Sequence, residues 1–184
     1  MCIRDSAKEM QANLIITSGP NLDKPRTLTD KLRALKRGDI LLIDEVHRMR
    51  SVVGEILYSA LEDGFVESAG RLRRTSNRID LSPFTAIGCT THVGDIDAPL
   101  RDRMPLQFTL SYYTQEEISQ VITRSANISD IPITSLAVST LARCSRGTPR
   151  VANSLLFRAR DYALVKGDGT LTEDIARASL ESSR

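Results

Sequence analysis

Several residue types are scarce in this sequence, and their scarcity narrows the classes of protein that it can encode. It has no tryptophan, two histidines and three cysteines in 184 residues. The cysteines, Cys2, Cys89 and Cys144, lack the short spacings of zinc sites, so we expect reduced thiols in a cytoplasmic protein. No apolar run approaches the roughly 20 residues that span a bilayer, so we expect no membrane partner.

An excess of one charge is also missing. Lysine and arginine total 25 against 23 aspartates and glutamates, a formal net charge of +2. The field of the whole chain therefore does not predict nucleic-acid binding, and any such surface must come from local clusters. The polar residues 1–6 are too few for a secretory signal. We expect them to be a leader foreign to the fold, because a strand-and-loop pattern begins abruptly after them.

What the sequence does contain is a run of four apolar residues, 40–43, that ends in Asp44 and Glu45. Such a run predicts a central parallel strand that is buried on both faces. Open α/β sheets bind ligands at the carboxyl ends of their strands, and the pattern is that of a Walker B motif. Asp44 would hold Mg²⁺, and Glu45 would polarise the water that attacks the γ-phosphate of ATP. The alternative is a buried strand that ends in acidic residues by chance.

Further elements are predicted around this strand. Residues 14–17 form a short strand, and residues 84–89 form a second buried strand with Cys89 in the core and Thr90 and Thr91 at its end. A hydroxyl there is placed to position water or to sense the γ-phosphate. Helices are predicted to begin at the capping residues Thr27 and Ser51. The first ends at Gly38 and the second at the turn Glu62-Asp63-Gly64. The inward face of the second helix is predicted to be Val52, Ile56, Leu57, Ala60 and Leu61.

The segment 65–81 has the pattern of a β-hairpin with its tip at 70–77. It carries four arginines, namely Arg71, Arg73, Arg74 and Arg78. They form either a solvated basic loop or a surface that contacts DNA or an acidic partner. Downstream, Arg101 and Arg103 flank Asp102. They are either a surface salt-bridge cluster or the source of an arginine finger, whose planar fork suits a transferring phosphoryl group. Residues 107–110 are predicted to form a last strand.

Everything after Tyr112-Tyr113 is predicted to be helical. Helices begin at Thr114, at Thr134 or Ser135, at Thr148-Pro149 and at Thr172. Their apolar faces include Leu136 and Val151 among the residues expected inside. Arg150 lies in the first turn of its helix, where a cation is electrostatically unfavourable. A phosphate held between two domains would explain it, and an exposed arginine without a partner is the alternative.

Four segments in this order are similar to the RuvB family of AAA+ motors, which drive branch migration of Holliday junctions. They are 42–48, 87–91, 99–103 and 146–153. The resemblance covers about residues 7–180. It implies an α/β fold, in which residues 7–111 form the C-terminal part of an AAA+ ATPase domain, with a parallel sheet, flanking helices and a β-hairpin. Residues 112–184 are implied to be a small all-helical lid.

The resemblance also implies roles for single residues. Asp44 and Glu45 match Walker B, Thr90 matches sensor 1 with Thr91 left open, and Arg103 rather than Arg101 matches the finger that reaches the ATP of the next subunit. Arg150 matches sensor 2. Tyr113 and the turn Glu62-Asp63-Gly64 fall where the family contacts or borders the nucleotide. The implied cofactors are ATP and Mg²⁺. The implied partners are Holliday junction DNA, a RuvA-like protein docked by the hairpin, and identical subunits in a hexameric ring, acting in recombination, repair and the SOS response.

The chain departs from the family pattern in several places. It contains no Gly-x-x-x-x-Gly-Lys-Ser/Thr sequence, and no winged-helix domain follows the lid. We therefore expect the chain to be the middle portion of a divergent member, inactive as an ATPase by itself. Arginines at the hairpin tip, His92 in place of an arginine and Met104-Pro105 in place of Phe-Gly are further differences.

Two other functions compete with this interpretation. Residues 44–47 also spell the DExH box of another helicase superfamily, but that superfamily has no Thr-Pro-Arg sensor in a helical lid. A non-catalytic scaffold, similar to the inert subunits of clamp loaders, is the second alternative. Glu45 argues against it, because a scaffold does not need the acid that polarises water.

Overall fold

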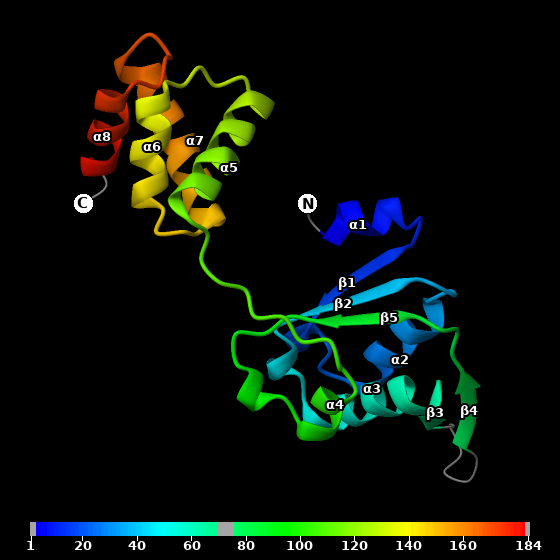
Figure 1. Ribbon diagram of the computed structural model, residues 1–184. Coiled ribbons are helices and arrows are strands. Elements are labelled where there is room, and N and C mark those ends of the chain that lie inside the picture. The colour runs from blue at the N-terminus through cyan, green and yellow to red at the C-terminus, as the bar shows by residue number, and fades with distance from the viewer. Residues whose placement is uncertain (1–2, 70–75, 183–184) are drawn as a thin grey trace. The chain divides into compact units, whose positions relative to one another are not determined.

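The computed structural model describes residues 3–69 and 76–182 (Figure 1). Contacts divide the chain into two compact units, Met1–Gln107 and Phe108–Arg184. The elements of the first unit are α1 (Ile3–Glu9), β1 (Leu14–Ser18), η1 (Gly19–Asn21), α2 (Pro25–Ala34), β2 (Ile40–Asp44), η2 (Val46–Arg48), α3 (Ser51–Asp63), β3 (Phe65–Ala69), β4 (Ser76–Asp80), β5 (Thr85–Gly88), η3 (Val93–Asp95) and α4 (Ala98–Asp102).

The first unit is built on a parallel sheet with the strand order β1-β2-β5. Leu42 of the central strand β2 pairs with Ile16 of β1 and with Ile87 of β5. Leu41 and Ile43, on one face, are fully buried, which confirms the predicted central strand. Leu42, on the other face, is only half-buried, so the predicted burial of both faces holds only in part. Because the strands are parallel, the carboxyl ends of β1, β2 and β5 meet at one edge, where β2 ends in Asp44.

Helices α2 and α3 cover one face of this sheet (Figure 1). The core consists of fully buried side chains from these helices and from β2, including Leu28, Leu32, Leu41 and Leu57. Ile16, which points to the other face of β1, is 43% exposed. The two helices therefore pack on one face of the sheet, and this packing fixes the position of β2.

The predicted hairpin is confirmed as the antiparallel pair β3 and β4, in which Phe65 lies opposite Asp80. The second strand begins at Ser76, inside the segment predicted to be the tip. Arg71, Arg73 and Arg74 lie outside the described residues. Arg78 packs its guanidinium 4.1 Å from the centre of the Phe65 ring and pairs with Asp80 at 2.9 Å. This arginine is thus engaged within the hairpin.

The predicted beginnings of the two helices were wrong. Helix α2 begins at Pro25 rather than after Thr27, because proline fits the first helical position, where its missing N–H costs nothing. It ends at Ala34, before Gly38. The N-cap of α3 is Arg50, and Ser51 is already helical.

The predicted inward face of α3 was wrong by one residue at its start. Val53 and Gly54 are buried, whereas Val52 is 55% exposed. Leu57 and Ala60 are buried as predicted, and Ile56 and Leu61 are half-buried and pack against the same core. Only the first turn was displaced, since the sequence pattern does not fix where the helix begins.

The strand predicted at residues 107–110 does not form. Phe108 and Leu110 are more than 80% exposed in an extended segment. A strand needs a neighbour for its backbone hydrogen bonds, and no described strand pairs with this segment. For the same reason β5 is an edge strand rather than a buried one, and Cys89 is exposed rather than in the core.

The described part of the second unit consists of helices. Its loops also form one isolated β-bridge, between Ile133 and Leu171. The helices are α5 (Gln115–Ile128), α6 (Ser135–Cys144), α7 (Pro149–Lys166) and α8 (Glu173–Glu181). Thr114 and Glu117 form the predicted capping box, and the side chains of Thr134 and Thr172 cap α6 and α8. The unit therefore has the all-helical architecture that the sequence predicted.

Two residues predicted inside this unit are outside. Leu136 is 62% exposed and Val151 is 42% exposed, whereas their neighbours Ala137 and Ala152 are fully buried. The core contains small residues where the helices come close, together with larger side chains such as Leu141 and Leu156. At both sites the small alanine, rather than the larger apolar neighbour, occupies the closely packed interface between helices.

Candidate functional site

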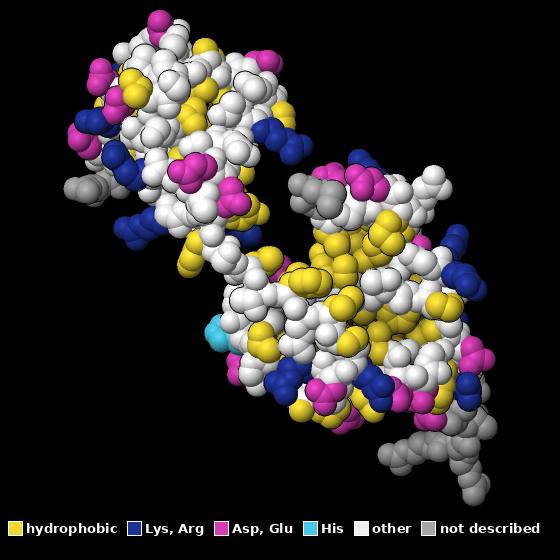
Figure 2. All heavy atoms as spheres, viewed as in Figure 1, with side chains coloured by type: hydrophobic (Ala, Val, Ile, Leu, Met, Phe, Trp, Pro, Cys, Tyr) yellow, Lys and Arg dark blue, Asp and Glu magenta, His cyan; other side chains and the backbone are white. Residues whose placement is uncertain are grey.

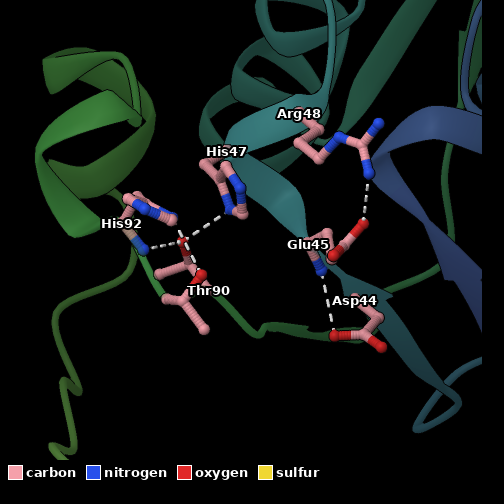
Figure 3. Close-up of polar contacts among 7 residues, drawn as sticks. Asp44, Glu45, His47, Arg48, Thr90 and His92 are labelled. Atoms are coloured by element: carbon pink, nitrogen blue, oxygen red, sulfur yellow. Dashed lines mark hydrogen bonds and ion pairs between the residues drawn. The ribbon is translucent and has the colours of Figure 1, made fainter.

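The carboxyl end of β2 forms a tight turn that presents two carboxylates. Glu45 has a left-handed backbone, with φ 48° and ψ 46°, and its N–H donates to Asp44 Oδ1 at 3.0 Å. The guanidinium of Arg48 donates to Glu45 Oε2 at 2.9 Å (Figure 3). A left-handed backbone is costly for a residue other than glycine and is concentrated at functional sites. The turn places Asp44 and Glu45 at the carboxyl end of β2, the end at which open α/β sheets bind ligands.

The backbone of Gly19 packs directly against this turn. It follows the carboxyl end of β1, and a Cβ there would meet the carbonyl oxygen of Glu45 and lie 2.9 Å from the nitrogen of Met49. Only glycine permits this approach of one backbone to another. Sequence analysis did not assign this role to Gly19. The Ser-Gly-Pro sequence directly after a predicted strand was the available signal.

Backbone hydrogen bonds hold the carboxyl end of β5 next to the turn formed by Asp44 and Glu45. The N–H of Cys89 donates to the carbonyl of Ile43 at 2.9 Å, and the N–H of Val46 donates to the carbonyl of Cys89 at 3.0 Å. Partial burial of its thiol and, second, the charge of Asp44 raise the pKa of Cys89. Thr90, the next residue, therefore lies beside the turn formed by Asp44 and Glu45.

A hydrogen-bond network joins Thr90 to both histidines of the chain (Figure 3). Thr90 Oγ1 lies 2.8 Å from Nδ1 of His47 and accepts the backbone N–H of His92 at 2.9 Å. The two imidazole centres are 4.9 Å apart. His47 follows Glu45 by two residues, so this network connects the turn that carries the carboxylates with the loop that carries the threonines.

Thr91 has a different environment. Its Oγ1 lies 2.8 Å from Nδ1 of His92, and both side chains are exposed. Thr90 is half-buried and has two partners, whereas Thr91 faces solvent with one. The structure thus gives the two adjacent threonines distinct positions, and the accessible hydroxyl is that of Thr91.

Arg103 directly follows α4 and lies against the C-terminal half of α3. Its Nε forms an ion pair with Glu62 Oε2, and its guanidinium carbon lies 5.7 Å from the centre of the Tyr58 ring. Hydrogen bonding with the Tyr58 side chain, followed by the charge of Glu62, raises the pKa of Arg103. The predicted finger is thus held by its own subunit. Sequence analysis singled out Glu62 for the nucleotide and missed Tyr58 altogether.

Glu62, Asp63 and Gly64 do not converge on Asp44 and Glu45. They stand at the C-terminal end of α3, which Gly64 closes in a left-handed conformation with φ 68°. The 13 residues of α3 span about 20 Å, and its first turn is the end nearer to the Walker B turn. Within one subunit, the structure brings Glu62 to Arg103 instead.

In the second unit, Tyr113 lies against the turn that precedes α7. Its N–H donates to the carbonyl of Gly147 at 3.0 Å. A Cβ at Gly147, whose φ is 73°, would lie 2.9 Å from Cβ of Tyr112. Arg150 lies in the first turn of α7, as predicted, and its side chain is exposed. A cavity of about 640 Å³ adjoins these residues and is lined by Tyr112, Cys144, Ser145, Arg146, Thr148 and Val151.

Within residues 3–69 and 76–182, no three histidine, cysteine, aspartate or glutamate side chains gather as a ready-made metal cluster. Mg²⁺ is usually held by one or two carboxylates together with substrate phosphates and water. Asp44 donates hard oxygens of this kind and keeps one oxygen outside its bond to the Glu45 N–H. The residues present therefore fit a nucleotide-bound Mg²⁺ rather than a resident ion.

A parallel sheet whose central strand ends in an Asp-Glu turn, followed in the chain by a helical unit, fits the AAA+ class of P-loop NTPases, and the family models assign the chain to it. Residues 4–110 match the family model of the Holliday junction DNA helicase RuvB P-loop domain, and residues 113–184 match the RuvB AAA lid domain. The chain belongs to the RuvB family.

Solved structures of Thermotoga maritima RuvB are similar to this chain. The Holliday junction branch migration motor is 40% identical with a TM-score of 0.83. A lysine-to-arginine variant and a proline-to-glycine variant are both 39% identical, with TM-scores of 0.85 and 0.86. All three comparisons cover 96% of this chain but only 55%, 55% and 56% of the respective relatives. The chain thus spans little more than half the length of these proteins.

No described helix is both long enough and apolar enough to cross a membrane.

Proposed function

We propose that this chain is part of a subunit of an ATP-driven motor that moves Holliday junction DNA. The carrying observation is the edge of the sheet where Asp44, Glu45 and Thr90 meet, in a chain of the RuvB family. The similar Thermotoga maritima protein is named a Holliday junction branch migration motor. In this proposal the subunits form a homohexameric ring in the cytoplasm. The ring works with a RuvA-like partner in recombination and repair.

Each site residue has a chemical task in the proposal. Asp44 holds the Mg²⁺ that accompanies ATP, and this ion supplies charge neutralisation at the phosphates. Glu45 orients and polarises the attacking water, which requires it to leave its pair with Arg48. Arg103 places its planar cation at the phosphates of the neighbouring subunit, where negative charge spreads during transfer. Arg150 and Tyr113 contact the nucleotide from the lid.

The variants solved for Thermotoga maritima RuvB support the choice of Arg103 over Arg101. One variant replaces a threonine by valine, and another replaces an arginine 12 positions later by alanine. Arg103 follows Thr91 by the same interval, whereas the residue 12 positions before Arg101 is Cys89. The altered proline lies 46 positions beyond that arginine, and Pro149 follows Arg103 by 46. By this spacing Thr91 is the better candidate for sensor 1, and Thr90 is its neighbour in the network.

The alternative is a non-catalytic AAA+ subunit of the kind found in clamp loaders. The acidic turn argues against it, because a scaffold would gain nothing from the left-handed backbone of Glu45. A scaffold also would not require the supporting glycine at position 19. A catalytic role for the carboxylate would explain both the strained backbone of Glu45 and the close approach of Gly19.

A subunit-mixing experiment tests the proposal. The P-loop segment of Thermotoga maritima RuvB is joined upstream of this chain, so that the subunits contain a complete nucleotide site. Subunits with Arg103→Ala or Glu45→Gln should each lose ATP turnover in the presence of junction DNA. Mixed rings should recover part of it, because some interfaces combine an intact finger with an intact acid. If every mixture is as inactive as either variant, or if the unsubstituted protein does not hydrolyse ATP, the proposal is wrong.

A further inference from the structure

We propose that Glu62 and Tyr58 are positioning residues for Arg103, and that α3 thereby connects the Walker B turn of one subunit with the finger that this subunit presents to its neighbour. This inference rests on the proposed function, in which Arg103 acts at the site of the adjacent subunit. It assigns a task to two side chains on α3 that lie away from the acidic turn of their own sheet.

The contacts hold the guanidinium from two directions. Glu62 engages Nε, and the Tyr58 ring lies beneath the planar group at 5.7 Å. A guanidinium has five N–H donors, so a pair through Nε leaves donors for oxygen atoms of another molecule. The side chains of Arg103 and Glu62 are 43% and 32% exposed. The cation is therefore fixed in direction and still accessible, which is the combination that a finger needs.

The contacts of Glu62 and Tyr58, which together form a clamp on the guanidinium, compensate for the little support that the backbone around Arg103 provides. The residue stands at the end of α4, a helix of only five residues, and a long segment without helix or strand follows it. An arginine on such a segment would sample many rotamers, and each productive contact would require ordering. Pairing with a helix whose inner face is packed in the core transfers that ordering to the folded subunit before any neighbour arrives.

The clamp residues belong to a rigid element that begins close to the acidic turn. Helix α3 starts three residues after Arg48, which pairs with Glu45. Its inward side chains Val53, Leu57 and Ala60 are at most 3% exposed in the core. A shift of the Walker B turn would therefore displace α3 as a body, and the displacement would reach Arg103 through Glu62 and Tyr58.

A surface ion pair without this role would contribute little, because exposed pairs add almost nothing to stability. The two possibilities predict different kinetics. A positioning pair affects the chemical step at the neighbour's site and leaves nucleotide binding unchanged. A merely structural pair affects neither, or affects both through loss of fold.

The first arm of the test uses the 184-residue chain alone. The Nε–H signal of Arg103 should be resolved by ¹H–¹⁵N NMR and should exchange slowly with water, because its proton is held by Glu62. Glu62→Gln should speed this exchange at least tenfold. Glu55→Gln removes a carboxylate from the same helix and should leave the signal unchanged. Fast exchange in the unsubstituted chain would overturn the inference.

The second arm uses the P-loop-extended subunits. Glu62→Gln should lower kcat about tenfold with KM for ATP unchanged, and Tyr58→Leu should act in the same direction. Glu62→Asp, which keeps the charge, should recover much of the loss, and Glu55→Gln should behave as the unsubstituted protein. Arg103→Ala that is inactive beside a fully active Glu62→Gln would overturn this inference alone. Arg103→Ala that remains active would instead overturn the proposed function.

Discussion

Gly19 and Glu45 are in backbone contact, so that the end of β1 supports the turn that carries the acid at the end of β2. A Cβ at Gly19 would meet the carbonyl of Glu45 and the nitrogen of Met49, and both of these are main-chain atoms that cannot rotate away. The strained conformation of Glu45, with φ 48°, is thus held from outside the turn itself.

Gly19→Ala should destabilise the first unit by about 2 kcal/mol, since the added methyl overpacks a site lined by backbone. Urea unfolding of the 184-residue chain measures the change. Gly94→Ala is the matched control, because a Cβ at Gly94 meets nothing within 4 Å. It should stay within about 0.5 kcal/mol of the unsubstituted chain. Equal effects of the two substitutions would contradict the packing seen at Gly19.

The caps of α5 and α7 make a comparison within one unit. Thr114 accepts the N–H of Glu117 at 3.2 Å, whereas Thr148, at the same position of α7, makes no side-chain cap bond. Thr114→Ala should therefore cost about 1 kcal/mol of the unfolding free energy of the helical unit. Thr148→Ala should cost much less. Thermal unfolding followed by far-UV circular dichroism measures both, and a larger loss for Thr148→Ala would be inconsistent with the capping geometry.

Asp39 should make stability dependent on pH. It is 6% exposed and accepts the N–H groups of Lys36 at 2.8 Å and Asn13 at 3.2 Å. The bond from Lys36 is the main cause that lowers the pKa of Asp39 below its ordinary 3.8. A lowered pKa in the folded state means stability that is present above the ordinary value and lost as the pH falls through the folded value.

Asp39→Asn should accordingly be less stable than the unsubstituted chain at pH 7, and the difference should shrink as the solution is acidified below pH 4. Urea midpoints measured between pH 7 and pH 3 provide the comparison. Asp30→Asn is the control, because Asp30 is exposed and its pair with Arg26 is long, at 3.6 Å. A constant difference across this range would show that the charge of Asp39 is not responsible.

The neutral form of His47 should carry its proton on Nε2. Thr90 Oγ1 accepts the N–H of His92, and donation of its own hydroxyl proton to Nδ1 of His47 would give that proton a partner as well. Long-range ¹H–¹⁵N correlations distinguish the two tautomers. Thr90→Val should release the preference at His47, whereas Thr91→Val should change only His92. A proton on Nδ1 of His47 in the unsubstituted chain would contradict the assigned direction of the bond.

Local sequence was sufficient where one segment decides the outcome by itself. The apolar run before Asp44 specifies the central strand, and the capping box at Thr114 specifies the beginning of a helix. Each depends on residues within a few positions of one another, so period, capping and turn chemistry act on them directly. The family resemblance of separated motifs was likewise contained in the sequence.

Tertiary structure alone decided the features that need a partner far along the chain. A strand at 107–110 and a buried β5 were predicted from composition. A strand forms only where another strand supplies its hydrogen bonds. Among the described strands, none pairs with residues 107–110, and β5 has a neighbour on one side alone. The meetings of Gly19 with Glu45, of Thr90 with His47 and of Arg103 with Glu62 join residues 26 to 43 positions apart. Sequence patterns report the period of one element, whereas these contacts follow from how separate elements pack.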